Sequence, residues 1–173
     1  MAKILYGVCG IGMGHAIRSK VILEELSKKH DILVLASHEP YRFLAEKFSR
    51  VYDIEGFELV LHKNQILNMR TFFRNIGKAR WKTYRQFRHV EEIIDSFQPD
   101  IVISDWETYT SVYATQHHLP LISVDNGHFI KYGAYRYPSK YKMQQSKAVF
   151  VLHSLLARAQ HYVIFCFDAQ RLK

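Results

Sequence analysis

The sequence contains few residues that could support the fold through covalent or metal cross-links. Only two of its 173 residues are cysteine, Cys9 and Cys166, and both lie in apolar runs. This pattern predicts neither a disulfide framework nor a metal site, and it favours a reducing, cytoplasmic location. The fold must therefore rest on an apolar core, for which 48% hydrophobic residues are sufficient material.

Long apolar runs are also missing, which limits the membrane classes that fit this chain. No run reaches the roughly eighteen residues that a membrane-spanning helix needs. The first run, residues 3–9, is interrupted by glycine and followed by charge, as in a buried strand and unlike a signal peptide. We expect residues 1–173 to form a single domain that at most touches a membrane from the cytoplasmic side.

Acidic residues are absent from residues 63–90, although this segment holds eight lysines and arginines. Residues 1–62 and 91–173 each hold equal numbers of both signs, so the segment accounts for the whole net charge of +8. Aromatic side chains alternate with these cations, and the combination would suit binding to an anionic membrane surface or to a nucleic acid. Alternatively, the aromatic side chains belong to the core and the cations form a solvated face. The expected patch consists of Arg70, Arg74, Arg80, Lys82, Arg85 and Arg88.

Short apolar runs alternate with segments of helical spacing along most of the chain. We expect strands at 3–9, 31–36, 100–105, 120–124 and 162–167, with a further short strand somewhere in 51–62. We expect helices at 15–28, from about Pro40, at 65–76, 79–97 and 107–117, and over much of 139–158. This order predicts an α/β fold with a Rossmann-like parallel sheet and helices on both faces.

The helical spacing also predicts which side chains of the first helix face the sheet. At 15–28, Ile17, Val21, Ile22 and Leu26 should point inward. In sheets of this kind ligands bind beyond the carboxyl ends of the strands, near the switch in strand order. Candidate site residues should therefore lie at 10–15, 37–39, 105–108 and 125–128.

The first of these loops, GIGMGH, places three glycines directly before a histidine. Gly10, Gly12 and Gly14 allow close approach of a ligand to backbone N–H groups, and the following helix end favours an anion. His15 would lie in the first helical turn, where the dipole favours its neutral form and suits it as a general base. A tight turn without function remains an alternative. The spacing is not the dinucleotide fingerprint GxGxxG, but Glu39 could bind a ribose, so a small NAD-binding enzyme also remains.

Polar residues follow two later strands. Asp105 ends the run DIVISD, where its carboxylate could hydrogen-bond one imidazole nitrogen of His15, or instead cap the helix at 107–117. Asp125, Asn126 and His128 could line the same crevice, or form an ordinary Asp-Asn-Gly turn.

Three stretches together resemble the N-terminal domain of GT-B glycosyltransferases: GIGMGHAIRS, PDIVISDWE and PLISVDNGH. The branch most similar is bacterial and archaeal, with a GxGH loop and an arginine three residues on, here Arg18. More distantly the chain is similar to the N-acetylglucosaminyltransferase that makes lipid II and to plant UDP-glycosyltransferases. The resemblance implies that His15 deprotonates an acceptor hydroxyl, that Asp105 orients His15, and that the glycines approach the donor diphosphate. It adds Arg18, Asp125, Asn126 and His128 as expected substrate-binding residues.

The resemblance also implies a nucleotide-sugar donor such as a UDP-sugar, without a permanently bound cofactor. GT-B enzymes bind most of this donor in a C-terminal domain that this sequence does not contain, so we expect the chain alone to be inactive. Similarity to the lipid II enzyme favours an anionic membrane or a lipid-linked acceptor as partner of the basic segment, and no nucleic acid. A non-catalytic module that binds membrane surfaces stays open as an alternative.

Overall fold

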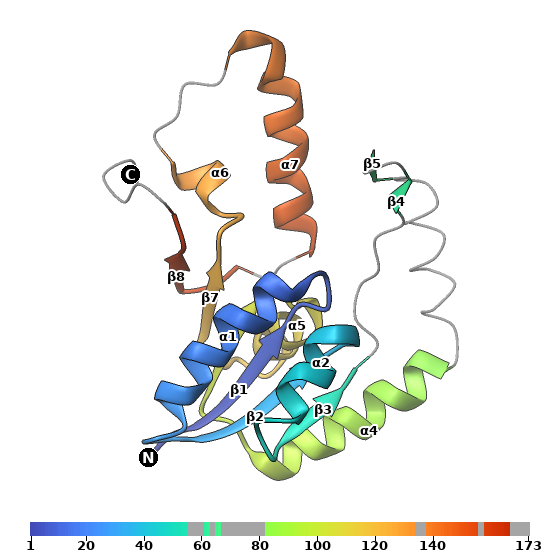
Figure 1. The fold of residues 1–173 in the computed structure, drawn as a ribbon, viewed down its shortest axis with the longest axis vertical. Coiled ribbons are helices and arrows are strands. Elements are labelled where there is room, and N and C mark those ends of the chain that lie inside the picture. Colours follow the sequence, from blue (N-terminus) through green and yellow to red (C-terminus); the bar gives the residue numbers. More distant parts are fainter. Residues whose placement is uncertain (55–60, 63–64, 67–81, 134–137, 156–157, 167–173) are drawn as a thin grey trace.

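The computed structural model describes residues 1–54, 61–62, 65–66, 82–133, 138–155 and 158–166 (Figure 1). Its main feature is a six-stranded parallel sheet in the order β3-β2-β1-β6-β7-β8, with a separate antiparallel pair β4-β5. The predicted Rossmann-like sheet is therefore confirmed. The strand order reverses between β1 and β6, so their carboxyl ends form the switch point where ligands bind in such sheets.

The strands are short and mostly apolar. In chain order they are β1 (Lys3–Val8), β2 (Asp31–Ala36), β3 (Val51–Asp53), β4 (Leu61–His62), β5 (Gln65–Ile66), β6 (Ile101–Asp105), β7 (Leu121–Asp125) and β8 (His161–Ile164). The helices are α1 (Met13–Leu26), α2 (His38–Ala45), α4 (Lys82–Phe97), α5 (Thr108–Gln116), α6 (Phe129–Tyr132) and α7 (Lys142–Leu155), with a 3-10 turn η1 (Ser139–Tyr141).

Alternating side chains divide the core between the two faces of the sheet. One cluster contains Leu5, Leu33 and Val102 together with residues of α4 and α5. The other contains Tyr6, Val34 and Ile103 with residues of α1 and α2. Buried apolar area on both faces explains why the strands carry continuous apolar runs rather than a polar–apolar alternation.

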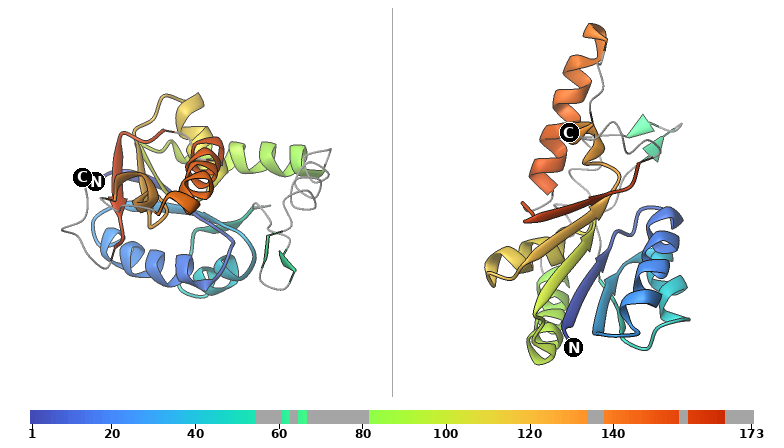
Figure 2. Two further views of the ribbon diagram at one scale, coloured as in Figure 1. Left: turned by 90° about the horizontal axis from the view of Figure 1, so that it is seen from above. Right: turned by 90° about the vertical axis from the view of Figure 1, so that its left-hand side faces the viewer.

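The helices cover the sheet as this division requires, and Figure 2 shows the layers from two further directions. Helix α5 lies especially close to β1: a Cβ atom at Gly7 would be 2.1 Å from Thr110 Oγ1. Beyond the carboxyl ends of the strands stand α6 and α7 (Figure 1). Helix α5 therefore packs tightly against the sheet beside the switch point.

Most predicted elements agree with the structure to within a few residues, but two expectations are wrong. In α1, Ile17 and Val21 are 57% and 59% exposed, whereas the fully buried residues are Ala16, Ser19 and Leu23. The helix is rotated because its small residues permit a closer approach to the sheet. Gln65 and Ile66 lie in β5 rather than at the start of a helix, and the remainder of 67–76 is outside the described residues.

No helix within the described part of the chain is both long enough and apolar enough to span a membrane.

Candidate functional site

The glycine loop joins β1 to α1 at the switch point. Gly12 has a φ of 84°, a conformation that favours glycine, and a Cβ atom at Gly10 would lie 2.1 Å from Ser37 Oγ. Gly14 has open space where a Cβ atom would be. Helix α1 begins without a side-chain cap and without an acidic residue in its first turn. Its first backbone N–H groups are therefore available to an anion that approaches the loop.

His15, in the first turn of α1, contacts Asp105 at the end of β6. His15 Nδ1 lies 2.8 Å from Asp105 Oδ1, so the structure brings together two residues that are ninety positions apart. The side chain of Asp105 is fully buried, whereas that of His15 is 19% exposed. A buried carboxylate on one ring nitrogen leaves the other nitrogen to exchange a proton with a substrate.

Two further groups of α1 hold the Asp105 carboxylate. Arg18 donates hydrogen bonds from Nε to Oδ2 at 3.0 Å and from Nη2 to Oδ1, and Ser19 Oγ donates to Oδ2 at 3.0 Å. The Arg18 guanidinium also lies 5.1 Å from the centre of the Phe165 ring. Arg18, which was expected at the substrate, is thus engaged with Asp105.

Capping of α5 does not explain the position of Asp105. That helix is capped by Glu107, whose carboxylate accepts from Tyr109 N at 2.8 Å and from Thr110 N at 2.6 Å. Burial raises the pKa of Glu107 and outweighs the lowering effect of these hydrogen bonds. Asp105 is therefore free of the capping role, and all its side-chain partners described above belong to α1.

A second histidine–aspartate pair follows β7. His128 Nδ1 lies 2.5 Å from Asp125 Oδ2, His128 N donates to Oδ1 at 2.7 Å, and Ser123 Oγ donates to Oδ2 at 2.7 Å. Burial acts to raise the pKa of Asp125, but the hydrogen bonds from His128 and Ser123 prevail and lower it. The His128 ring packs against Tyr162 at 4.5 Å between ring centres.

The aspartates of the two pairs differ in the face of the sheet to which their side chains point. Ile103, two residues before Asp105, packs on the α1 face, while Leu121, four residues before Asp125, packs on the α5 face. Since side chains alternate along a strand, Asp105 and Asp125 point to opposite faces. The hydrogen bonds agree, because Asp105 binds α1 whereas His128 packs against Tyr162 of the α5-side cluster.

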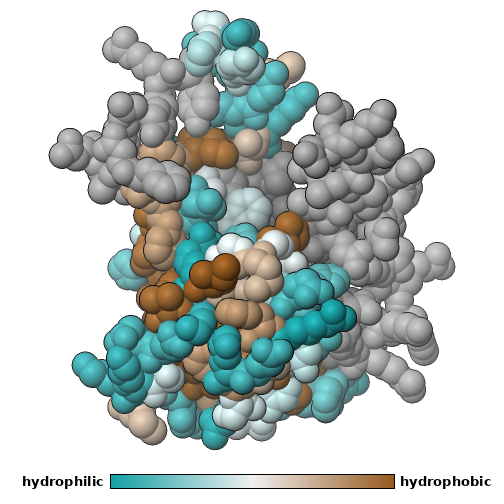
Figure 3. Space-filling model, in the orientation of Figure 1, coloured by the Kyte–Doolittle hydropathy of each residue, from teal (hydrophilic) through white to brown (hydrophobic). Residues whose placement is uncertain are grey.

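Asn126 is exposed and lies at the same hollow as Arg18. Both line a cavity of about 490 Å³ with Val21, Ile22, Phe165 and Cys166. Around it, exposed apolar side chains of α1 and of the segment from Val163 to Phe165 gather on one face (Figure 3). The sheet thus has an apolar hollow close to the Arg18–Asp105 pair.

Other expected residues lie elsewhere or outside the described part. Glu39 is in α2, where its carboxylate pairs with Arg42 at 3.0 Å on the surface. Arg88 is exposed on α4, and the backbones of Lys82 and Arg85 lie in the same helix. The expected patch residues Arg70, Arg74 and Arg80 are outside the described residues.

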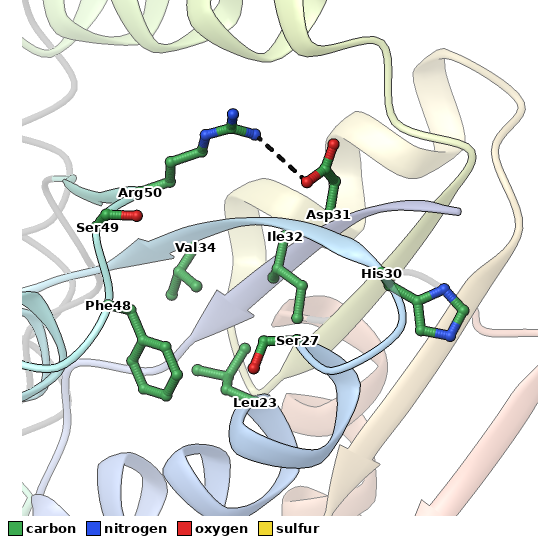
Figure 4. Close-up of a pocket in the computed structure, with 9 residues that line it drawn as sticks. All are labelled: Leu23, Ser27, His30, Asp31, Ile32, Val34, Phe48, Ser49 and Arg50. Atoms are coloured by element: carbon green, nitrogen blue, oxygen red, sulfur yellow. Dashed lines mark ion pairs between the residues drawn. The ribbon is translucent and has the colours of Figure 1, made fainter. Parts of the chain in front are cut away.

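A separate hollow at the opposite, amino-terminal end of β2 has no connection with these residues. It lies between the end of α1 and the segment Phe48–Arg50, and an ion pair of 3.9 Å joins Arg50 to Asp31 at its rim (Figure 4). Within the described residues, no group of three or more metal-ligating side chains is present.

Ser19 and Glu107 are parts of the site that sequence reasoning missed. Ser19 follows Arg18 in α1 and is fully buried. Its burial can be recognised only when it is known which side of α1 faces the sheet. The capping role of Glu107 was not predicted, because aspartate is the preferred residue before a helix and Asp105 therefore appeared the better candidate for the cap of α5.

Comparison with protein families gives one match: the family model described as glycosyl transferase family 1 matches residues 2–173. A comparison with curated protein sequences gives no match.

Several solved glycosyltransferases have a similar fold. The spinosyn rhamnosyltransferase SpnG has a TM-score of 0.55 and 12% identity, over 95% of this chain and 45% of its own. Arabidopsis thaliana UGT89C1 complexed with UDP has a TM-score of 0.51 and 14% identity, over 98% of this chain and 46% of its own. Acinetobacter baumannii MurG has a TM-score of 0.50 and 12% identity, over 86% of this chain and 39% of its own. The chain thus spans less than half the length of each of these structures.

Proposed function

Since the chain belongs to glycosyl transferase family 1, we propose that it is the acceptor-activating part of a transferase that moves a sugar from a nucleotide-sugar onto an acceptor hydroxyl. The observation that carries the proposal is the His15–Asp105 contact of 2.8 Å at the switch point. His15 removes the proton of the acceptor hydroxyl, and the oxygen attacks the anomeric carbon with inversion. The bond between that carbon and the diphosphate oxygen breaks in the same step, and the nucleoside diphosphate leaves with the bonding electrons. Asp105 orients the ring and stabilises the imidazolium that forms.

Arg18 and Ser19 act in this proposal as positioning residues. Arg18 donates to both carboxylate oxygens of Asp105 and Ser19 donates to Oδ2. These hydrogen bonds fix the carboxylate, which in turn orients His15. A base held in one orientation avoids the cost of reorganisation during proton transfer.

The uncapped start of α1 is the proposed contact for the donor diphosphate. The loop from Gly10 to Gly14 precedes a fourteen-residue helix without an acidic first turn, which suits the charge of a diphosphate. We choose a UDP-sugar as donor because the fold of UGT89C1, a structure complexed with UDP, is similar. Most of the donor would be held by a second domain, so this chain alone should not transfer sugar.

The test is a kinetic measurement on the full-length protein with UDP-glucose as donor. His15→Ala should lower the transfer rate at least about a hundredfold, because general-base catalysis contributes roughly 10² to 10⁴. His89→Ala, which removes an exposed histidine on α4, is the matched control and should be indistinguishable from the wild type. Near-wild-type turnover of the His15 variant would remove His15 from the mechanism.

The charge pattern of residues 63–90 favours a second, compatible role in docking to anionic membranes. Each cation near such a surface contributes about 1 kcal/mol, so neutralising four should weaken binding to vesicles about a thousandfold. The variant replaces Arg80, Lys82, Arg85 and Arg88 by Gln, and the control replaces Lys20, Lys28, Lys29 and Lys47 by Gln. Equal losses in both variants, or no binding of the wild type at low salt, would contradict this role.

A further inference from the structure

The acidic and basic residues in the second half of the chain lie in separate stretches. Residues 91–125 contain seven aspartates and glutamates and no lysine or arginine, whereas residues 126–167 contain six lysines and arginines and no acidic residue. The equal totals over 91–173 therefore result from two stretches of opposite charge. The acidic stretch forms most of α4 with β6, α5 and β7, and the described part of the basic stretch forms α6, η1, α7 and β8.

Three of the six cations of the basic stretch belong to η1 and α7. These are Lys140, Lys142 and Lys147, and all three are exposed. Helix α7 stands beyond the carboxyl ends of the strands, as Figures 1 and 2 both show, and it packs mainly against α6 and η1. Its outer side is therefore turned away from the core of the sheet.

This outer side exposes large apolar side chains between the cations. Met143 is 63% exposed and Phe150 is 71% exposed, and Tyr141 of η1 is 47% exposed. Met143, Lys147 and Phe150 are spaced by four and three residues, so they share one side of the helix, whereas the half-buried Ala148 lies on the other side. Large apolar side chains gathered on one exposed side are typical of a surface that meets an apolar partner.

The chemistry of these side chains suits a lipid surface. Lys140 Nζ lies 4.9 Å from the centre of the Tyr141 ring, and on α6 Lys131 Nζ lies 4.9 Å from that of Tyr132. Tyrosine combines an apolar ring with a polar hydroxyl, which suits the headgroup region of a bilayer. Methionine can enter the bilayer interface, as Met143 would, but it offers no ring on which a base could stack. Lipid therefore explains the surface better than nucleic acid does.

We propose that the outer side of η1 and α7 docks onto an anionic membrane. Its apolar side chains enter the interface and its lysines contact the lipid phosphates; the residues are Tyr141, Met143, Phe150, Lys140, Lys142 and Lys147. This contact is separate from the one proposed for residues 63–90 and does not depend on the transfer reaction. Because α7 stands beyond the carboxyl ends of the strands, docking turns the end of the sheet that carries Asp105 toward the membrane.

The first experiment measures binding of the 173-residue chain to vesicles of phosphatidylglycerol and phosphatidylcholine at low salt. Replacing Lys140, Lys142 and Lys147 by Gln should weaken binding about a hundredfold, because each cation near such a surface contributes roughly a factor of five. Replacing Met143 and Phe150 by Gln should weaken it at least about tenfold, because their burial in the interface is lost.

Matched controls carry the same numbers of substitutions on other elements. One replaces the exposed Lys28, Lys29 and Lys47 by Gln, and the other replaces Ile17 and Val21, which are 57% and 59% exposed on α1. Both should bind vesicles as the wild type does. Equal losses in the controls, or unchanged binding of the α7 variants, would overturn the proposal and would leave docking through residues 63–90 and the transfer reaction as they stand.

The second experiment places α7 relative to the lipid. Phe150→Trp adds fluorescence to that of the wild type, and brominated acyl chains in the vesicles should quench the added signal. Val112→Trp, at a residue of α5 that is 41% exposed, is the control and should not be quenched. Absence of quenching at Phe150→Trp would contradict the proposal.

Two further results would assign the surface to another partner and overturn the proposal. One is binding of single-stranded RNA that requires the same three lysines, without quenching of Phe150→Trp by lipid. The other is a dimer in sedimentation that dissociates on Phe150→Gln while vesicle binding stays unchanged, which would identify a second copy of the chain as the partner.

Discussion

The chain contains two histidine–aspartate pairs with similar distances and different surroundings. His15 and Asp105 come from different elements, ninety residues apart, and meet at 2.8 Å. Asp125 and His128 are three residues apart in one turn and meet at 2.5 Å. The His15 side chain is 19% exposed and that of His128 is 8% exposed.

The partners of each pair suggest different roles. Asp125 also accepts from the backbone N–H of His128, as expected of an aspartate that stabilises a turn, and Tyr162 packs on the histidine ring. Asp105 caps no helix, and its contacts with Arg18 and Ser19 orient it toward His15. Proximity of histidine and aspartate is therefore insufficient to identify a catalytic pair; access to the ring and the absence of a local structural role are needed as well.

The largest effect that separates the two pairs is expected from Asp105→Asn. This change leaves the guanidinium of Arg18 largely buried without its counterion, which should lower the free energy of unfolding by about 3 kcal/mol. It should also lower transfer at least about a hundredfold in the full-length protein, because the amide no longer stabilises the imidazolium. Denaturant unfolding and initial-rate kinetics measure the two effects.

A double variant separates stability from catalysis at this position. Asp105→Asn combined with Arg18→Met removes both charges and should regain much of the lost stability. Its transfer rate should stay as low as that of the single variant. Recovery of activity together with stability would mean that Asp105 serves only the fold.

A smaller effect, on stability alone, is expected from Asp125→Asn. The pKa of Asp125 is lowered in the folded protein, so its carboxylate contributes stability above its unfolded pKa, near 4, and loses it as the pH falls through the folded value. Loss of hydrogen bonds to a charged group should cost about 1.5–3 kcal/mol at neutral pH. The difference from the wild type should shrink below about pH 4 in denaturant titrations. A pH-independent difference, or a hundredfold loss of transfer, would reverse the roles of the two pairs.

Apolar runs were sufficient to predict the sheet and the edge of the sheet at which His15 and Asp105 meet. The run at Asp31–Ala36 forms β2 with the same bounds, and the apolar runs that end at Val8 and Asp105 lead to the switch point. Because parallel strands align their carboxyl ends, residues that follow such runs could be expected to meet. His15 and Asp105 do meet.

The apolar pattern of the sequence did not predict which side of α1 faces the sheet, to which face each aspartate points, or which residue caps α5. In α1, Ala16 and Ser19 pack against the sheet because they are small, which leaves Ile17 and Val21 outward although they are more apolar. Asp105 and Asp125 point to opposite faces because alternate residues of β6 and β7 pack toward α1 and toward α5. Which residues of a strand face α1 is decided by how the strand packs in the folded protein, and the apolar runs do not reveal it.

The most direct test of the proposed base is the tautomer of His15, because Nδ1 lies 2.8 Å from Asp105 Oδ1 and also 2.9 Å from Arg18 Nη2. If Asp105 orients the ring, Nδ1 carries the proton in the neutral form and Nε2 is free to accept one from the acceptor. Nitrogen-15 NMR of the labelled chain, with His15→Ala for assignment, distinguishes the two ring nitrogens by their chemical shifts. We predict a protonated Nδ1 and an unprotonated Nε2. A protonated Nε2, with Nδ1 accepting from Arg18, would leave no base at this position and would contradict the proposed mechanism.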